Sequence, residues 1–162
     1  MTAQRREWKA ACRGIALIAL LAAAPSGSRA ATTERIVADR FTGLAISGFD
    51  PVAYFTDGGP WLGDAAYELS AAGVVWRFRN EGNRASFAAH PEVYGPQFGG
   101  YDPVDVARGV AYPGNPRLWL VVNQRLYLFG REESRDAFAA GSAAVLAEAR
   151  KRWTALQSEL AR

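Results

Sequence analysis

Gly48-Phe49-Asp50-Pro51-Val52 recurs in this chain of 162 residues as Gly100-Tyr101-Asp102-Pro103-Val104. In both places the aspartate favours the N-cap of a helix, because its carboxylate accepts hydrogen bonds from unpaired amides of the first turn. Proline suits the next position, since its missing N–H would have no partner there. The phrase therefore predicts two rigid helix starts. Each is a potential anion or ligand site, because free amides and the helix dipole point outward there. We ascribe the recurrence of so short a string to chance.

The amino-terminal segment has the pattern of a secretory signal peptide. The apolar stretch 15–24 is too short to span a bilayer comfortably, and it follows four basic residues: Arg5, Arg6, Lys9 and Arg13. Small side chains at Ser28 and Ala30 predict cleavage after Ala30. An uncleaved anchor is the alternative, and Arg5-Arg6 leaves a twin-arginine export route open. We expect a signal peptide over residues 1–30, a flexible leader over 31–43, and a single domain over 44–160.

Removal of residues 1–30 changes which chemistries are available. The segment carries five of the 19 Lys and Arg residues and one of the 16 Asp and Glu residues, so the mature net charge is −1. Such a balance gives no argument for binding to nucleic acid or to an anionic membrane. The only cysteine, Cys12, leaves with the segment, and His90 is the sole histidine. We therefore expect no disulfide, no thiol chemistry and no zinc site built from Cys and His.

From Leu44 onward, hairpin signals alternate with helix signals. Two hairpins are predicted where apolar strands flank short turns, and the second should lie centrally because both of its faces are apolar. The expected segments are a strand over 44–47, a first hairpin over 67–79, a helix over 83–90 with Asn83 as its cap, a helix over 103–108, a second hairpin over 118–129, and a C-terminal helix over 132–160 that breaks at Gly141 and Ser142. The fold class is α+β: a small, mainly antiparallel sheet built from hairpins, with short helices and a C-terminal amphipathic helix.

The order of motifs along the chain resembles that of exported YHS-domain proteins. The resemblance covers roughly Leu44 to Trp153, and the residues that carry it are Gly48–Phe55 with Asp57 and Gly58, Trp76, Phe78, Glu81, Asn83, Arg84, Phe87, Pro91–Tyr94, Pro96–Tyr101, Trp119, Leu126–Leu128 and Trp153. It implies a small α+β domain that is secreted to the periplasm. The family has poorly defined activity and is often suspected of binding metals.

The chain departs from the family pattern at Asp102. The family carries a cysteine or selenocysteine after Gly-Gly-Tyr, where this sequence has the aspartate. A thiol at a helix N-terminus would have a lowered pKa and would favour the reactive thiolate. Asp102 keeps the negative charge without the redox activity or the affinity for soft metals. Its simplest role is that of a helix cap.

We expect a non-catalytic periplasmic binding or accessory domain that needs no cofactor. Its partner would be a small ligand or a periplasmic protein, with neither nucleic acid nor, after signal cleavage, a membrane involved. The candidate pocket lies between the two Asp-Pro turns, and its expected ligand-binding residues are Asp50, Tyr54, Tyr94, Tyr101 and Asp102. Since no Ser/His/Asp spacing or phosphate-binding glycine loop occurs, the sequence does not favour an enzyme. His90 reads as the C-terminal residue of a helix, with a ligand role as the alternative.

Two alternatives stay open. Asp50, Asp102 and Asp105 could supply oxygen ligands for a hard metal ion such as Ca²⁺, although these carboxylates alone do not complete a site. The C-terminal helix could instead bind a protein partner through its apolar stripe, which consists of Leu146, Ala149, Trp153, Leu156 and Leu160. The simpler interpretation is that this stripe packs on the domain itself, with Glu148 and Arg152 paired on the solvent-exposed face of the helix.

Overall fold

The computed structural model describes residues 35–161, so the predicted signal peptide and its cleavage site lie outside the described residues. The elements follow in this order: η1 (Ile46–Gly48), α1 (Ala53–Thr56), β1 (Asp64–Ala71), β2 (Val74–Phe78), α2 (Glu81–Ala89), α3 (Pro91–Tyr94), η2 (Gln97–Gly100), α4 (Pro103–Ala107), β3 (Asn115–Val122), β4 (Arg125–Phe129) and α5 (Glu132–Leu160). The strands pair as two separate antiparallel hairpins, β1–β2 and β3–β4. The predicted α+β class is confirmed.

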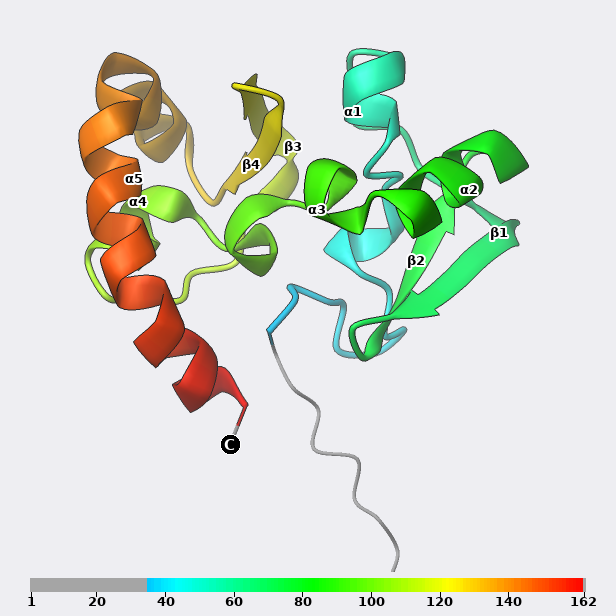
Figure 1. Cartoon of the computed structure of the whole chain (residues 1–162), viewed down its shortest axis with the longest axis horizontal. Helices are drawn as coiled ribbons and strands as arrows, with labels where there is room; N and C mark the ends of the chain where they lie inside the picture. The colour runs from blue at the N-terminus through cyan, green and yellow to red at the C-terminus, as the bar shows by residue number, and fades with distance from the viewer. Residues whose placement is uncertain (1–34, 162) are drawn as a thin grey trace, which may run out of the picture. The chain divides into compact units, whose positions relative to one another are not determined.

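The elements form two copies of one structural unit (Figure 1). We call residues 46–94 the first copy and residues 97–160 the second copy. Each begins with a 3₁₀ turn and continues through an Asp-Pro helix start, a β-hairpin and a longer helix. Both hairpins turn through two residues with positive φ, Ala72-Gly73 and Asn123-Gln124. This conformation suits the right-handed twist of paired strands, and both turns lie where the sequence predicts them.

Hydrogen bonds around the Asp-Pro phrase recur in both copies. The Asp50 amide donates to the Trp61 carbonyl at 2.8 Å, and the Asp102 amide donates to the Tyr112 carbonyl at 2.9 Å. In each copy a hydrogen bond between two glycines closes the equivalent loop. The Gly63 amide donates to Gly48 O, and the Gly114 amide donates to Gly100 O, both at 2.9 Å. Each first strand then opens on an Asx turn, in which the side chain of Asp64 or Asn115 accepts from the amide two residues later. A register shift follows in both hairpins.

The aromatic cores of the two copies also correspond. In the first copy, the Phe87 ring of α2 lies 4.7 Å from Trp76 and 5.3 Å from Phe78, measured between centroids. The second copy repeats these contacts at 4.9 and 5.2 Å, where the Phe138 ring of α5 contacts Tyr127 and Phe129. A five-residue string that recurred by chance would not bring equivalent turns, hairpins and ring contacts with it. The attribution to chance is therefore wrong, and the phrase marks the start of a structural repeat.

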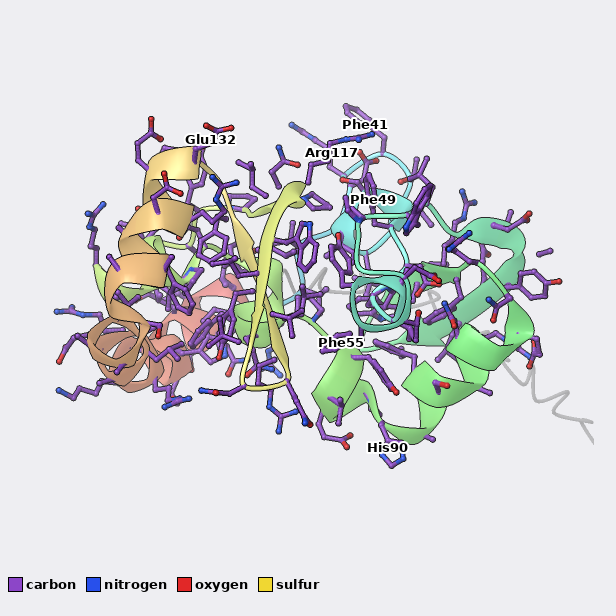
Figure 2. All side chains as sticks on the ribbon, turned by 90° about the horizontal axis from the view of Figure 1, so that it is seen from above. Phe41, Phe49, Phe55, His90, Arg117 and Glu132 are labelled. Carbon is purple, nitrogen blue, oxygen red and sulfur yellow. The ribbon has the colours of Figure 1, made fainter. Side chains whose placement is uncertain are left out.

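The second hairpin lies between the two cores, as its apolar faces predict (Figures 1 and 2). Leu126 and Leu128 of β4 pack into the cluster of the first copy, whereas Tyr127 and Phe129 pack into that of the second. The first hairpin differs because the counterpart of Leu128 is Arg77, which forms an ion pair with Glu68 at 2.7 Å. The first hairpin thus carries a half-exposed ion pair at this position, whereas residues 126–129 of β4 are buried.

Two local predictions differ from the structure. The cap of α2 is Asn80 rather than Asn83, because the Asn80 side chain accepts the Asn83 amide at 2.8 Å. The predicted strand at 44–47 is replaced by the η1 turn, in which Ile46 and Ser47 adopt φ of 42° and 56°. A left-handed backbone does not continue a strand, so only isolated bridges form there.

The predicted leader is held in place over its described part. The Val37 amide donates to Gly99 O, and the Ile46 amide donates to Val37 O, both at 2.8 Å. Val37 thereby joins the two 3₁₀ turns, one from each copy. The structure differs here from the expected loose leader because backbone pairing, which side-chain composition does not reveal, fixes the segment.

The C-terminal helix α5 packs on its own domain. Its break is at Gly141, as predicted, where the backbone has φ −154° and ψ 45°. Ala149 and Leu156 are buried beside Tyr101 and Val106, so the apolar stripe covers α4. Glu148 pairs with Lys151 at 2.6 Å, one position earlier than the predicted partner Arg152.

Candidate functional site

Asp50 is a fully buried structural link. Its Oδ1 accepts the amides of Val52 and Ala53 at 2.8 and 3.3 Å, in the turn that leads into α1, whose N-cap is Val52. Its Oδ2 accepts the Arg79 amide at 2.8 Å and the Asn83 Nδ2 at 2.6 Å. The carboxylate therefore ties the helix start to the end of the hairpin and to α2.

Asp102 performs the same task in the second copy, where it is also fully buried. Its Oδ1 accepts the Val104 amide, and its Oδ2 accepts the Gly130 amide just after β4, both at 2.9 Å. The predicted capping role of Asp102 is confirmed. The side chain at this position faces inward, toward backbone donors.

Asp105, the third carboxylate of the metal site considered above, forms ion pairs with two arginines. Arg131 Nη2 contacts both of its oxygens, at 2.8 and 2.6 Å, and Arg108 approaches at 3.6 Å. Asp50 lies in the other copy, where it accepts amides of the turn before α1. Within residues 35–161, no group of three or more His, Cys, Asp or Glu side chains lies close enough together to hold a metal ion.

Two of the three candidate tyrosines, Tyr54 and Tyr94, lie in the apolar cluster of the first copy, and Tyr101 lies in another cluster. The Tyr54 hydroxyl donates to Pro116 O at 2.8 Å, and its ring lies edge-on to Trp119 at 5.3 Å. Tyr94 of α3 packs edge-on against Phe55 at 5.4 Å. Tyr101 is buried near Trp153. Tyr54 and Tyr101 thus belong to separate apolar clusters.

Burial of Tyr54 carries a pH prediction. Burial, with the nearby Asp50 charge as the second cause, raises the pKa of Tyr54 well above its ordinary value of 10. The protonated form is favoured in the folded state, so this contribution to stability is complete below about pH 10 and is lost as the pH rises further. We expect Tyr54→Phe to lose about 1 kcal/mol at pH 7, through the missing hydrogen bond, and to show a shallower alkaline decline. Urea unfolding between pH 7 and 11 measures both effects, and parallel curves for the two proteins would contradict the assignment.

The described residues contain an apolar cavity between the first copy and the two segments beside it, Ile36 and residues 95–98. Its volume is about 260 Å³, and the residues that line it are Ile36, Ala71, Ala72, Trp76, Phe87, Pro91, Glu92, Gly95, Pro96, Gln97 and Phe98. It is larger than the engineered cavity of about 150 Å³ that binds benzene. It is slightly smaller than the common range for ligand pockets, about 300–1,000 Å³. A single-ring molecule or an aliphatic side chain fits this size.

The rim of this cavity is polar, whereas its walls are apolar. Glu92 lies at the rim, and its Oε1 is 3.4 Å from His90 Nδ1. Arg125 of β4 donates to the Glu92 carbonyl at 2.9 Å. His90 points outward from the first copy (Figure 2). Inside, the Trp76 indole N–H donates to Ala71 O at 3.2 Å, which leaves its ring face as apolar wall.

A second cavity, of about 630 Å³, runs along the described part of the leader. Tyr101 lines it together with Asp39 and Arg40, so its walls mix charged and apolar groups. Neither cavity is lined by Asp50, Asp102, Tyr54 or Tyr94. Of the residues that the sequence singles out for binding, only Tyr101 reaches one of these two cavities.

Sequence reasoning missed the first cavity. Trp76 and Phe87 read as core positions, and both are indeed almost fully buried. The available signal is Gly95 between Tyr94 and Pro96, directly after a one-turn helix. Gly95 continues in extended backbone, with φ −63° and ψ 139°, so no second helical turn follows α3.

Residues 35–161 contain no helix that is both long enough and apolar enough to cross a membrane. Comparisons with protein-family models, with curated proteins and with solved structures found no match to this chain.

Proposed function

We propose that the chain is a non-catalytic binding or accessory domain whose binding site is the apolar cavity of the first copy. The observation that carries the proposal is a cavity of about 260 Å³ with walls from Trp76, Phe87 and Phe98 and a polar rim at Glu92. Apolar walls with a few polar groups at the edge are typical of ligand sites.

The non-catalytic assignment rests on how the polar groups are used. The buried carboxylates of Asp50 and Asp102 accept backbone amides, which leaves them no role as acid or base. Asp105 is paired with Arg131. His90 is exposed, and Glu92 lies beside it as an acidic partner. A domain that binds without turnover needs only the cavity.

Export and family are parts of the same proposal. The signal-peptide pattern of residues 1–30 supports delivery to the periplasm. The order of motifs from Leu44 to Trp153 supports membership of the exported YHS-domain proteins, in a form that carries Asp102 where the family has a thiol. The Asp102 carboxylate accepts hydrogen bonds from the amides of Val104 and Gly130, so it stabilises the same helix start without thiol chemistry.

Toluene is a suitable probe, because a single apolar ring fits the cavity. We expect toluene to raise the thermal unfolding temperature of residues 31–162 in a concentration-dependent way, since a ligand that binds only the folded state stabilises it. Ala71→Phe should abolish the shift, because Ala71 lines the cavity and the larger side chain fills it. Ala65→Phe is the matched control, because Ala65 lies exposed on the same strand.

Differential scanning calorimetry on the three proteins, with and without toluene, gives the result. Circular dichroism checks that both variants fold. If Ala71→Phe does not fold, Ala71→Leu replaces it as a smaller substitution that still fills part of the cavity. An equal shift in the wild type and in a folded Ala71 variant, or no shift in the wild type, would show that this cavity is not a binding site.

A further inference from the structure

The structural repeat continues to the end of the helix that follows each hairpin. His90 ends α2 with φ −139° and ψ 58°. Gly141 breaks α5 with φ −154° and ψ 45°. These residues are counterparts, since each follows the core phenylalanine, Phe87 or Phe138, by three positions. In both copies, the helix that follows the hairpin therefore breaks with a similar backbone conformation.

Beyond this break the two copies diverge. In the first copy, α3 makes one turn and ends before Gly95. In the second copy, α5 continues to Leu160. Counted from the break, Leu146 stands at the position of Gly95. The first copy therefore lacks both the longer helix and its first buried leucine.

Leu146 fills the corresponding place in the second copy. It is 8% exposed and belongs to the same apolar cluster as Tyr127 and Phe138, with Val122 and Val145 packed around them. The counterparts of Val122, Tyr127 and Phe138 are Ala71, Trp76 and Phe87, and all three line the cavity of the first copy. Gly95 lines it as well. The walls that the first copy gives to the cavity are thus the counterparts of residues around Leu146, and Ile36 with residues 96–98 lines the rest.

We propose that the cavity receives an aliphatic side chain from an amphipathic helix of a partner protein. α3 already takes the place of residues 142–145, so the partner helix would lie beyond Gly95, as residues 146–150 of α5 lie on the second copy. This inference rests on the proposed function and names the class of partner for the same site. The α5 helix of this chain is not free to serve, because Leu146, Ala149 and Leu156 are already buried in the second copy. A helix laid into an apolar groove through spaced anchor residues is a common mode of recognition.

The natural probe is the segment that fills the equivalent place. A fluorescent peptide of residues 145–160 carries the anchor Leu146 without the turn whose place α3 takes, and a lactam between Lys151 and an Ala147→Glu change keeps it helical, since isolated helices of this length are marginal. Residues 147 and 151 are exposed in α5, so the link lies away from the packed face. The matched peptide carries Leu146→Ser.

We expect fluorescence anisotropy to detect binding of the peptide to residues 31–162. Leu146→Ser should weaken binding about tenfold or more, because one buried leucine is lost. Ala71→Phe in the protein should abolish binding, with Ala65→Phe as the control. Toluene should compete with the peptide.

The outcomes separate the two proposals. If toluene binds at Ala71 but the peptide does not, or if the two peptides bind equally, the helix proposal is overturned and the proposed function stands. If the peptide binds a folded Ala71→Phe or Ala71→Leu variant as tightly as wild type, it binds elsewhere, for example by displacing α5, and the helix proposal again fails. If neither probe binds, both proposals fail.

Discussion

Asp50→Ala is expected to lower the free energy of unfolding by about 4 kcal/mol or more. The carboxylate is fully buried and accepts four donors, from Val52, Ala53, Arg79 and Asn83. Alanine leaves these donors without partners in the interior, and each unpaired buried group costs about 1–3 kcal/mol unless water reaches it. Because these bonds join α1, the hairpin and α2, the whole first copy loses its central link.

Two aspartates serve as controls in the same urea unfolding measurement. Asp102→Ala should lower the free energy of unfolding by about 2–4 kcal/mol, less than Asp50→Ala, because Asp102 accepts two backbone amides where Asp50 accepts four donors. Asp64→Ala should cost about 1 kcal/mol or less, since Asp64 accepts one amide in an exposed turn. A cost for Asp50→Ala no larger than that of Asp64→Ala would show that Asp50 is not a structural link.

Leu128→Ala and Phe129→Ala are expected to destabilise both copies together. The two residues are fully buried neighbours on β4, but Leu128 packs into the first cluster and Phe129 into the second. Truncation of a buried leucine costs about 2–5 kcal/mol, and that of a phenylalanine about 3–5 kcal/mol. Since both cores share the second hairpin, we expect a single unfolding transition rather than two.

Native-state hydrogen exchange tests this shared hairpin. Either substitution should lower the protection of slowly exchanging amides in β2 and in α5 by a similar free energy. Val110→Ala is the control, because Val110 is 52% exposed and its truncation should change little. Loss of protection in one copy alone would indicate two independent units.

The Asp-Pro phrase predicts local structure well because the interactions that it encodes are local. Asp102 caps α4, and the Asn123-Gln124 turn closes the second hairpin, both within a few residues of sequence. The central place of β4 is also visible, since apolar residues on both faces require burial on both sides. The second bonds of the two aspartates, to Arg79 and Gly130, join distant segments and have no local signal.

The repeat is hard to recognise because its counterparts share chemistry rather than identity. Trp76 corresponds to Tyr127, and Asp64 corresponds to Asn115. A second identical string, Phe87-Ala88-Ala89 and Phe138-Ala139-Ala140, recurs at a spacing of 51 residues, one fewer than the 52 between the two Asp-Pro phrases. The two matches therefore align only across a one-residue gap. Only the spacing of the second string marks Gly95 as the counterpart of Leu146. The cavity follows from this difference between the copies.

The predicted tyrosine pocket shows a different limit of sequence reasoning. Aromatic residues near two similar turns suggest one site, but the turns belong to different copies, and Tyr54 and Tyr101 fill different clusters. Aromatic composition predicts burial and not the cavity in which a ring lies. Only the packing of distant segments decides that.

The most direct test of the binding site is a set of intermolecular nuclear Overhauser effects between toluene and the isotope-labelled protein. The account predicts contacts from the toluene methyl group to the rings of Trp76 and Phe87, which line the cavity of the first copy. It predicts none to the counterparts Tyr127 and Phe138, whose place is filled by Leu146. Contacts to Tyr127 and Phe138 alone, or an absence of contacts to Trp76 and Phe87 at saturating toluene, would contradict it.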